Sequence, residues 1–210
     1  MKNFTRRQAL AYSATFASAS ILLACDEAPK KKTAESHNLT PEQLAFSSGD
    51  PTAKVVMQEF LSLTCSHCAR FHTEGYPLLK PLINEGKLLL VYRDFPLDGM
   101  ALRASLLARA LPPALGVKFQ HLLLENQSQW VNSDGDLSKL EGYARVAGLS
   151  PNKITEILAD EALMEEIVNE RQKAVDDYGI NGTPSFVIGK ELFGDGNFTD
   201  LADWVAGYTA

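Results

Sequence analysis

A pair of cysteines separated by two residues, Cys65 and Cys68, constrains the fold of this 210-residue chain more than any other feature. The pair follows an apolar run at 54–60 and opens a segment with helical spacing. We therefore expect a buried strand to deliver both thiols to the first turn of a helix. The unpaired backbone N–H groups of a helix N-terminus favour a thiolate on Cys65. The pattern predicts a redox-active dithiol.

A second motif, Gly-Ile-Asn-Gly-Thr-Pro at 179–184, leads into another apolar run at 185–188. Because proline has no N–H for a ladder hydrogen bond, Pro184 suits an edge strand or a special turn. Spacing alone does not make its peptide bond cis, since cis bonds are only about 5–6% of X–Pro bonds in folded proteins. The motif predicts a turn followed by a strand.

Four motifs together resemble the DsbA family of thiol–disulfide oxidoreductases. They are Glu-Phe at 59–60, Cys-Ser-His-Cys at 65–68, Tyr-Arg-Asp-Phe-Pro-Leu at 92–97 and Gly-Thr-Pro at 182–184. The resemblance covers residues 39–210. It implies an α/β, thioredoxin-like fold with an all-helical domain inserted in the middle of the catalytic domain.

The resemblance also implies that the bond before Pro184 is cis, that this proline packs beside the cysteines, and that Thr183 presents its backbone to a bound substrate strand. The chain departs from the family's enteric prototype at two positions. Ser66 stands where the prototype has proline, and Thr183 stands where it has valine. Both positions tune redox potential and partner choice in the family.

The expected chemistry needs few residues. Cys65, exposed at the helix N-terminus, is expected to be the nucleophilic cysteine, and the more buried Cys68 is expected to resolve the mixed disulfide. His67 is expected to stabilise the Cys65 thiolate by charge or hydrogen bond, and Ser66 to add a hydroxyl hydrogen bond. A stabilised thiolate favours the reduced form, which makes the disulfide form an oxidant.

An acidic residue, Glu59, interrupts the apolar run before the cysteines. An acid in such a run usually lies at an edge or turns toward solvent, and that interpretation is open here. The resemblance implies instead that the acid lies beneath the cysteines and helps to move protons when Cys68 ionises. Asp94 has a similar ambiguity.

The pattern also predicts domain boundaries. Residues 39–97 and 178–210 are expected to form the thioredoxin-like catalytic domain. Residues 98–177 show helical spacing without a strand run, so they are expected to form the inserted helical domain. Strands are expected at 54–60, 88–92, 185–188 and near Leu192, and helices at 65–86 with interruptions at Pro77 and Pro81, 100–111, 113–126, 137–147, 151–178 with a break near Asp160, and 199–206.

The N-terminal residues 1–24 have the pattern of an export signal. An arginine pair at 6–7 precedes a weakly apolar stretch of about sixteen residues, which is short for a membrane-spanning helix. The stretch ends in Leu-Leu-Ala-Cys, which resembles the lipobox of bacterial lipoproteins, so lipidation of Cys25 is expected. The arginine pair resembles a twin-arginine signal, with an ordinary Sec signal or an uncleaved anchor as alternatives. Three cysteines leave one odd thiol, which lipidation would remove.

Residues 25–38 are polar and are expected to form a tether. Fully extended, the thirteen residues after Cys25 would reach at most about 45 Å. Asp26 directly after the cysteine resembles the signal that keeps lipoproteins in the inner membrane. The expected location is therefore the bacterial periplasm, with a lipid anchor in the inner membrane.

Composition and spacing argue against other classes of function. A formal net charge of −6 is a poor balance for binding nucleic acid. A structural zinc site needs four ligands, usually supplied as two pairs, and the sequence has no second pair besides Cys65 and Cys68. A copper chaperone using Cys65, Cys68 and either His67 or His72 stays an alternative. We expect no bound metal and no cofactor, and we interpret His37, His72 and His121 as surface or local packing residues.

The function expected from these features is disulfide donation from the Cys65–Cys68 pair to unfolded or reduced exported proteins. A reductase or isomerase on the same fold is the alternative. Related isomerases carry a separate dimerisation domain, for which the segment before Thr40 is too short and too polar, which argues against an isomerase. A monomer is expected. The resemblance implies a quinone-linked membrane protein of the DsbB kind as the reoxidant.

Overall fold

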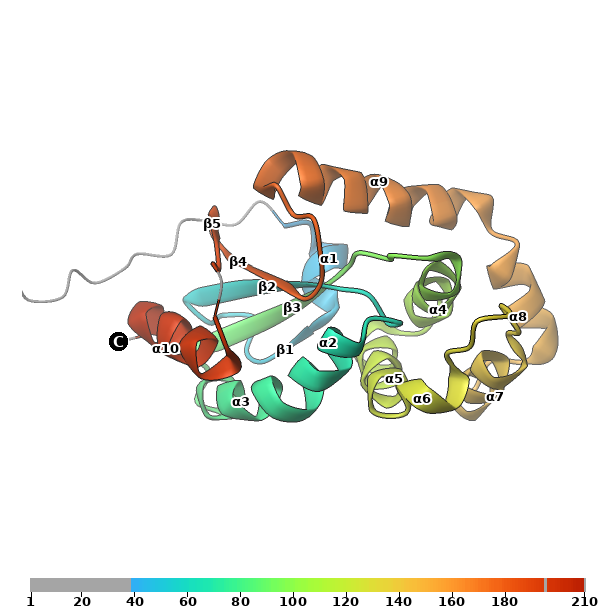
Figure 1. The fold of residues 1–210 in the computed structure, drawn as a ribbon, viewed down its shortest axis with the longest axis horizontal. Helices are drawn as coiled ribbons and strands as arrows, with labels where there is room; N and C mark the ends of the chain where they lie inside the picture. Colours follow the sequence, from blue (N-terminus) through green and yellow to red (C-terminus); the bar gives the residue numbers. More distant parts are fainter. Residues whose placement is uncertain (1–38, 195, 210) are drawn as a thin grey trace, which may run out of the picture. The chain divides into compact units, whose positions relative to one another are not determined.

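The computed structural model describes residues 39–194 and 196–209. Its centre is a five-stranded sheet with the strand order β1-β3-β2-β4-β5 (Figure 1). Strands β2 and β3 run parallel, whereas β4 runs antiparallel to β2. The strands are β1 Ser47–Ser48, β2 Val55–Leu61, β3 Leu88–Asp94, β4 Ser185–Ile188 and β5 Glu191–Leu192.

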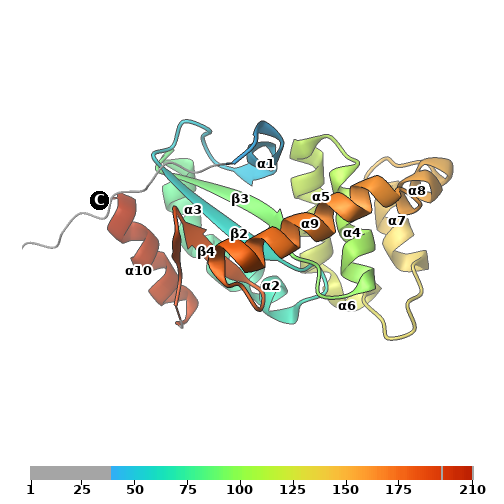
Figure 2. The ribbon, with the colours of Figure 1, turned by 90° about the horizontal axis from the view of Figure 1, so that it is seen from above.

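Helices cover both faces of this sheet. Helices α2, α3 and α10 lie on one face, and α1 and α9 lie on the other (Figures 1 and 2). Strands β2 and β3 are buried along their whole length, which explains their nearly continuous apolar sequence. The helices are α1 Pro41–Ala45, α2 Ser66–Arg70, the π-helical turn η1 Phe71–Gly75, α3 Tyr76–Asn84, α4 Gly99–Arg109, α5 Pro113–Glu125, α6 Gln127–Trp130, α7 Ser138–Val146, α8 Pro151–Leu158, α9 Glu161–Tyr178 and α10 Phe198–Thr209.

Helices α4 to α9 are inserted between β3 and β4, which confirms the predicted fold class. Figure 2 shows α4 to α8 gathered beside the sheet, while α9 runs back across it. We propose 98–177 as the boundaries of the inserted domain, because they enclose α4 to α8 and all of α9 except Tyr178. A single hydrophobic cluster joins Met57 and Leu90 of the sheet to Leu123 and Ile154 of the inserted helices. The two regions therefore share one core.

The helical segment after the cysteines contains a π-helical turn rather than the expected breaks at Pro77 and Pro81. In η1 the N–H of Tyr76 bonds to the carbonyl of Phe71, five residues earlier. Pro77 would press against the carbonyl of Thr73 in a regular α-helix, and a widened turn relieves that contact. Pro81 lies inside α3. The prediction that Pro77 and Pro81 interrupt the helix was therefore wrong: the irregular turn comes before Pro77, and the helix continues through Pro81.

Local signals placed several helix boundaries correctly. Thr40 caps α1 in a capping box with Gln43, and Ser150 caps α8. Strand β1 and helix α6 were not predicted, because two and four residues are too few to show a hydrophobic period. None of the helices described here is both long and apolar enough to cross a membrane.

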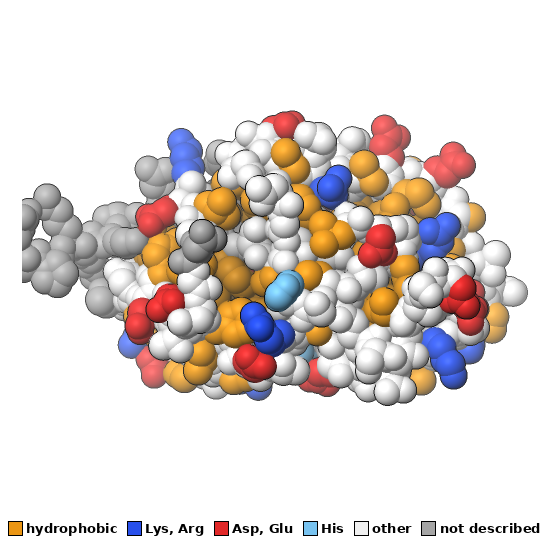
Figure 3. All heavy atoms as spheres, viewed as in Figure 1, with side chains coloured by type: hydrophobic (Ala, Val, Ile, Leu, Met, Phe, Trp, Pro, Cys, Tyr) orange, Lys and Arg blue, Asp and Glu red, His pale blue; other side chains and the backbone are white. Residues whose placement is uncertain are grey.

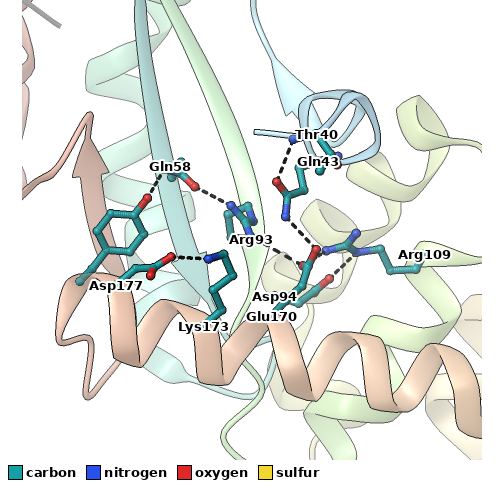
Figure 4. Close-up of polar contacts among 10 residues, drawn as sticks. Thr40, Gln43, Gln58, Arg93, Asp94, Arg109, Glu170, Lys173 and Asp177 are labelled. Carbon is teal, nitrogen blue, oxygen red and sulfur yellow. Dashed lines mark hydrogen bonds and ion pairs between the residues drawn. The ribbon is translucent and has the colours of Figure 1, made fainter. Parts of the chain in front are cut away.

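A buried polar network ties the inserted helices to the sheet (Figure 4). Arg109 of α4 contacts Asp94 of β3 at 2.5 Å and Glu170 of α9 at 3.0 Å. Next to Asp94 in β3, Arg93 donates from Nη1 to the side chain of Gln58 in β2 at 2.6 Å. Asp94 is only 2% exposed, so it does not face solvent, and its carboxylate accepts from Ser105 and Arg109 of α4. Its carboxylate holds α4 against the sheet.

Candidate active site

The two cysteines occupy the junction that the sequence predicts. Strand β2 ends at Leu61, a short loop follows, and Cys65 is the N-cap residue of α2. Both cysteines are free thiols; Cys65 is half-buried and Cys68 is fully buried. The helix therefore presents one thiol to the surface and holds the other in the core.

The two thiols have opposite electrostatic environments. A hydrogen bond from the Cys68 thiol is the largest cause that lowers the pKa of Cys65, from 9.0 to about 5. Burial opposes this change, whereas the backbone N–H groups of Cys68 and His67 act with it. Burial raises the pKa of Cys68 well above its ordinary value, and the charge of Glu59 adds to the rise. At neutral pH Cys65 is a thiolate and Cys68 a thiol.

The Gly-Thr-Pro motif lies directly against the cysteine pair. The Thr183–Pro184 peptide bond is cis, as the resemblance implies. The Sγ atom of Cys65 lies 3.3 Å from the carbonyl oxygen of Thr183. Strand β4 then begins at Ser185 and pairs with β2, so the sheet itself brings the two motifs together. The Thr183 hydroxyl is buried and has no hydrogen-bond partner among the described residues.

Glu59 lies in the middle of the sheet, so the interpretation of an edge or solvent-facing acid is wrong. It is 2% exposed, between Tyr92 of β3 and Phe186 of β4. Burial raises its pKa to about 8, and its Oε1 atom has no partner among the described residues. The negative charge of Glu59 raises the pKa of Cys68, which supports a place for this acid beneath the cysteines.

The side chains of Ser66 and His67 are both exposed at the start of α2. His67 acts on Cys65 through its backbone N–H, and no effect of its imidazole on that thiol is resolved. The Ser66 hydroxyl makes no hydrogen bond to another described residue, so the expected bond from this group is not seen. The stabilising groups at Cys65 are therefore the Cys68 thiol and the backbone N–H groups at the start of α2.

The family to which this geometry belongs follows from comparison with known proteins. The model of a family described as thioredoxin matches residues 41–206. The chain belongs to the thioredoxin family. The crystal structure of α-DsbA1 from Wolbachia pipientis is 28% identical with a TM-score of 0.69, covering 78% of this chain and 92% of that one. BdbD from Bacillus subtilis, at 18% identity and a TM-score of 0.69, covers 85% of this chain and 99% of that one and shows the same fold.

A provisionally named protein-disulfide oxidoreductase from Rickettsia typhi is 28% identical over 142 residues, covering 67% of this chain and 53% of the relative. Another from Rickettsia bellii is 29% identical over 142 residues, covering 67% of this chain and 55% of the relative. The chain thus spans about half the length of these curated relatives. Together the matches confirm the resemblance to the DsbA family.

In this thioredoxin-family chain a surface cavity of ≈ 480 Å³ adjoins the cysteines. It is lined by His67 and Arg70 of α2, by the turn at 183–184 and by residues of β4, β5 and α10. Phe186 and Phe198 form part of its apolar wall. Figure 3 shows hydrophobic side chains gathered on this face near an exposed histidine.

Sequence reasoning missed one residue at the site, Gln127 of α6. Its side-chain Nε2 donates to the carbonyl oxygens of Leu63 at 2.8 Å and Cys65 at 3.0 Å. No local sequence signal marks it, because its partners lie 64 and 62 residues away. Its contacts depend on how the inserted helices pack against the loop.

The other described histidines pack against each other. His72 is 9% exposed and packs on His121, with ring centroids 4.2 Å apart, and His121 contacts the Tyr92 hydroxyl at 2.9 Å. The interpretation as local packing therefore holds for this pair. In the described part of the chain, no three His, Cys, Asp or Glu side chains gather as a metal site. His37, Cys25, the export signal at 1–24 and the tether at 25–38 lie outside the described residues.

Proposed function

We propose that this protein is a disulfide oxidase, which donates its Cys65–Cys68 disulfide to reduced exported proteins as they fold. The contrast between the two thiols carries this proposal. The pKa of Cys65 is lowered to about 5, whereas that of Cys68 is raised. A stable Cys65 thiolate favours the reduced form of the pair, so the disulfide form gives up its bond readily.

The reaction begins when a client thiolate attacks Sγ of Cys65 in the oxidised protein. A client–Cys65 bond forms, the Cys65–Cys68 bond breaks, and Cys68 leaves with the electron pair. Because the pKa of Glu59 is raised to about 8, this buried acid is protonated at neutral pH and is the nearby proton donor for the Cys68 sulfur. The buried site thus avoids holding two negative charges together.

A second client thiolate then attacks the client sulfur of the mixed disulfide. The client disulfide forms and Cys65 leaves as a thiolate, so two electrons stay on the protein as Cys65 thiolate and Cys68 thiol. The proton on Cys68 came from Glu59, which takes up a proton that the client thiols release to water. The groups that lower the pKa of Cys65 make it a good leaving group. When no second client thiol is present, Cys68 reverses the reaction and frees the client.

The carbonyl of Thr183 and the turn at Pro184 lie beside the sulfur that reacts. We infer that an extended client segment lies along this turn, with apolar side chains in the adjoining cavity. We also infer that the protein works as a monomer. For its setting, we infer export to the periplasm, a lipid on Cys25, and reoxidation by a quinone-linked membrane protein of the DsbB kind.

The test is to mix the oxidised protein with a reduced peptide that contains two cysteines and follow both products by mass spectrometry. The expected result is stoichiometric transfer of the disulfide to the peptide. Cys65→Ser should transfer none, whereas Cys68→Ser should accumulate a peptide–Cys65 mixed disulfide. A wild-type protein that reduces an oxidised peptide but does not oxidise a reduced one would favour a reductase instead.

A further inference from the structure

The loop that carries Cys65 is held by residues of the inserted helical region. Gln127 of α6 uses both hydrogens of one amide group, donating to the carbonyl of Leu63 at 2.8 Å and to that of Cys65 at 3.0 Å. These carbonyls stand on either side of Thr64 in the loop between β2 and α2. A single side chain therefore spans the last turn of backbone before the active-site helix.

Two further contacts hold the same loop from the segment after β3. The Thr64 hydroxyl donates to Asp98 at 2.5 Å, and Asp98 also caps α4. The backbone N–H of Leu97 donates to the Ser62 hydroxyl at 3.3 Å. All these contacts come from outside the catalytic loop, so the position of Cys65 depends on the inserted helices as well as on its own strand and helix.

We propose that Gln127 is a positioning residue that keeps the Cys65 thiolate at the N-terminus of α2. The inference rests on the proposed function, because it assigns Gln127 to the same redox site. Gln127 touches no sulfur atom; it acts through the backbone carbonyls on either side of the loop.

Loss of the Gln127 amide would affect its two carbonyl partners differently. The Cys65 carbonyl also accepts from the N–H of Ala69 at 3.1 Å, so this group keeps a partner without Gln127. The Leu63 carbonyl has no other hydrogen-bond donor among the described residues. Without Gln127 this carbonyl must turn toward water, because an unpaired buried carbonyl is costly.

That movement would displace Cys65 relative to α2. The thiolate is stabilised by the Cys68 thiol and by the backbone N–H groups of Cys68 and His67, and these interactions depend on where Sγ lies. Hydrogen bonds to a charged group weaken steeply when their geometry is lost. The pKa of Cys65 should then rise toward that of an ordinary thiol. Gln127 thereby tunes the redox pair from a different part of the chain.

The test uses the full chain carrying Cys25→Ser, so that Cys65 and Cys68 are the only thiols. Gln127→Met keeps the size of the side chain and removes the donor. Gln129→Met makes the same change two residues away, on the exposed side of α6, and serves as the matched control. The Cys65 thiolate is titrated by its ultraviolet absorbance and by iodoacetamide labelling, and thermal unfolding is recorded for each variant.

Gln127→Met should raise the pKa of Cys65 by about one unit, because the displaced thiolate would lose part of its hydrogen bonding to the backbone N–H groups of α2. Gln127→Glu should raise it further, because a carboxylate repels both carbonyls. Gln129→Met should leave the titration at the wild-type value. Should Gln127→Met fail to fold, Gln127→Ala takes its place in the same comparison.

A lowered unfolding temperature with an unchanged Cys65 pKa would show a merely structural role and overturn the proposal. An equal shift in Gln129→Met would overturn it too, since the effect would then belong to the helix as a whole. The proposed oxidase function fails separately: wild-type protein would not oxidise a reduced peptide, whatever the titration of Gln127→Met shows.

Discussion

The Sγ atom of Cys65 lies 3.3 Å from the carbonyl oxygen of Thr183, a residue 118 positions further along the chain. This contact joins the N-terminus of α2 to the cis peptide turn that starts β4. Both elements are fixed by the pairing of β2 with β4 in the sheet. The reactive sulfur and the backbone that would meet a client are therefore held by one rigid scaffold.

The contrast between the two thiols predicts selective alkylation. With a pKa of about 5, Cys65 is mostly thiolate at pH 6, whereas Cys68 is buried and its pKa is raised. Iodoacetamide at pH 6 should therefore label Cys65 of the reduced protein and leave Cys68 unmodified. Peptide mapping by mass spectrometry gives the ratio. Equal labelling of both cysteines in the folded protein would contradict the assigned roles.

The exposed position of the His67 side chain predicts a modest effect of its removal. His67→Ala keeps the backbone N–H that contributes to the Cys65 environment. The pKa of Cys65 should therefore stay within about one unit of the wild-type value. Thiolate absorbance titration measures it. A return of the pKa to near 9.0 would instead assign the stabilisation to the imidazole.

The buried acid Glu59 predicts an unusual dependence of stability on pH. Its pKa is raised from 4.5 in the unfolded chain to about 8 in the fold. Between these values the folded protein binds more protons than the unfolded chain, so its stability falls as pH rises. The full loss attributable to this group is about 5 kcal/mol. Glu59→Gln should remove that dependence.

The measurement is urea unfolding of the oxidised protein at pH 5 and pH 8.5, so that neither cysteine titrates. Glu59→Gln should gain stability over the wild type at the higher pH and little at the lower one. Glu85→Gln changes an exposed acid, 55% exposed at its side chain, and should follow the wild type at both values. Parallel profiles for wild type and Glu59→Gln would show that Glu59 ionises normally.

The proposed lipid anchor predicts an effect in cells that is absent in the purified protein. A lipid on Cys25 and a tether reaching at most about 45 Å would confine Cys65 to a thin layer above the membrane. Confinement raises the effective concentration of a membrane-bound reoxidant. Cys25→Ser should therefore leave peptide oxidation in vitro unchanged but increase the fraction of reduced protein in cells, measured by thiol trapping. A mature N-terminus elsewhere than Cys25 would remove the premise.

The strands and helices around the cysteines could be predicted because local physics decides them. The apolar run before Cys65 indicates a strand covered on both faces, and Thr40 before Pro41 is typical of a helix N-cap. The inserted helices show the helical period clearly. These features depend on residues that are close in sequence, where hydrophobic spacing and capping patterns are informative.

The contacts that tune the site could not be predicted in the same way. Whether Glu59 faces solvent or the core depends on which strands flank β2, and β4 arrives from the far end of the chain. Gln127 reaches the cysteine loop only through the packing of α6, and the four residues of this helix are too few to show a hydrophobic period. The π-helical turn before Pro77 likewise depends on how a helix with a proline accommodates its neighbours. Tertiary contacts decided each of these outcomes.

The most direct test of the oxidase account is the reduction potential of the Cys65–Cys68 pair, measured by equilibration with glutathione at pH 7. A fall in the pKa of Cys65 from 9.0 to about 5 favours the reduced form by about two pKa units at this pH, or about 60 mV. The corresponding thiol of thioredoxin already has a pKa of about 7, so the difference from thioredoxin is smaller, about 50 mV. Relative to the thioredoxin value of about −270 mV, the account predicts a potential of about −220 mV or higher. A potential near −270 mV or below would contradict it and assign the protein to the reductases.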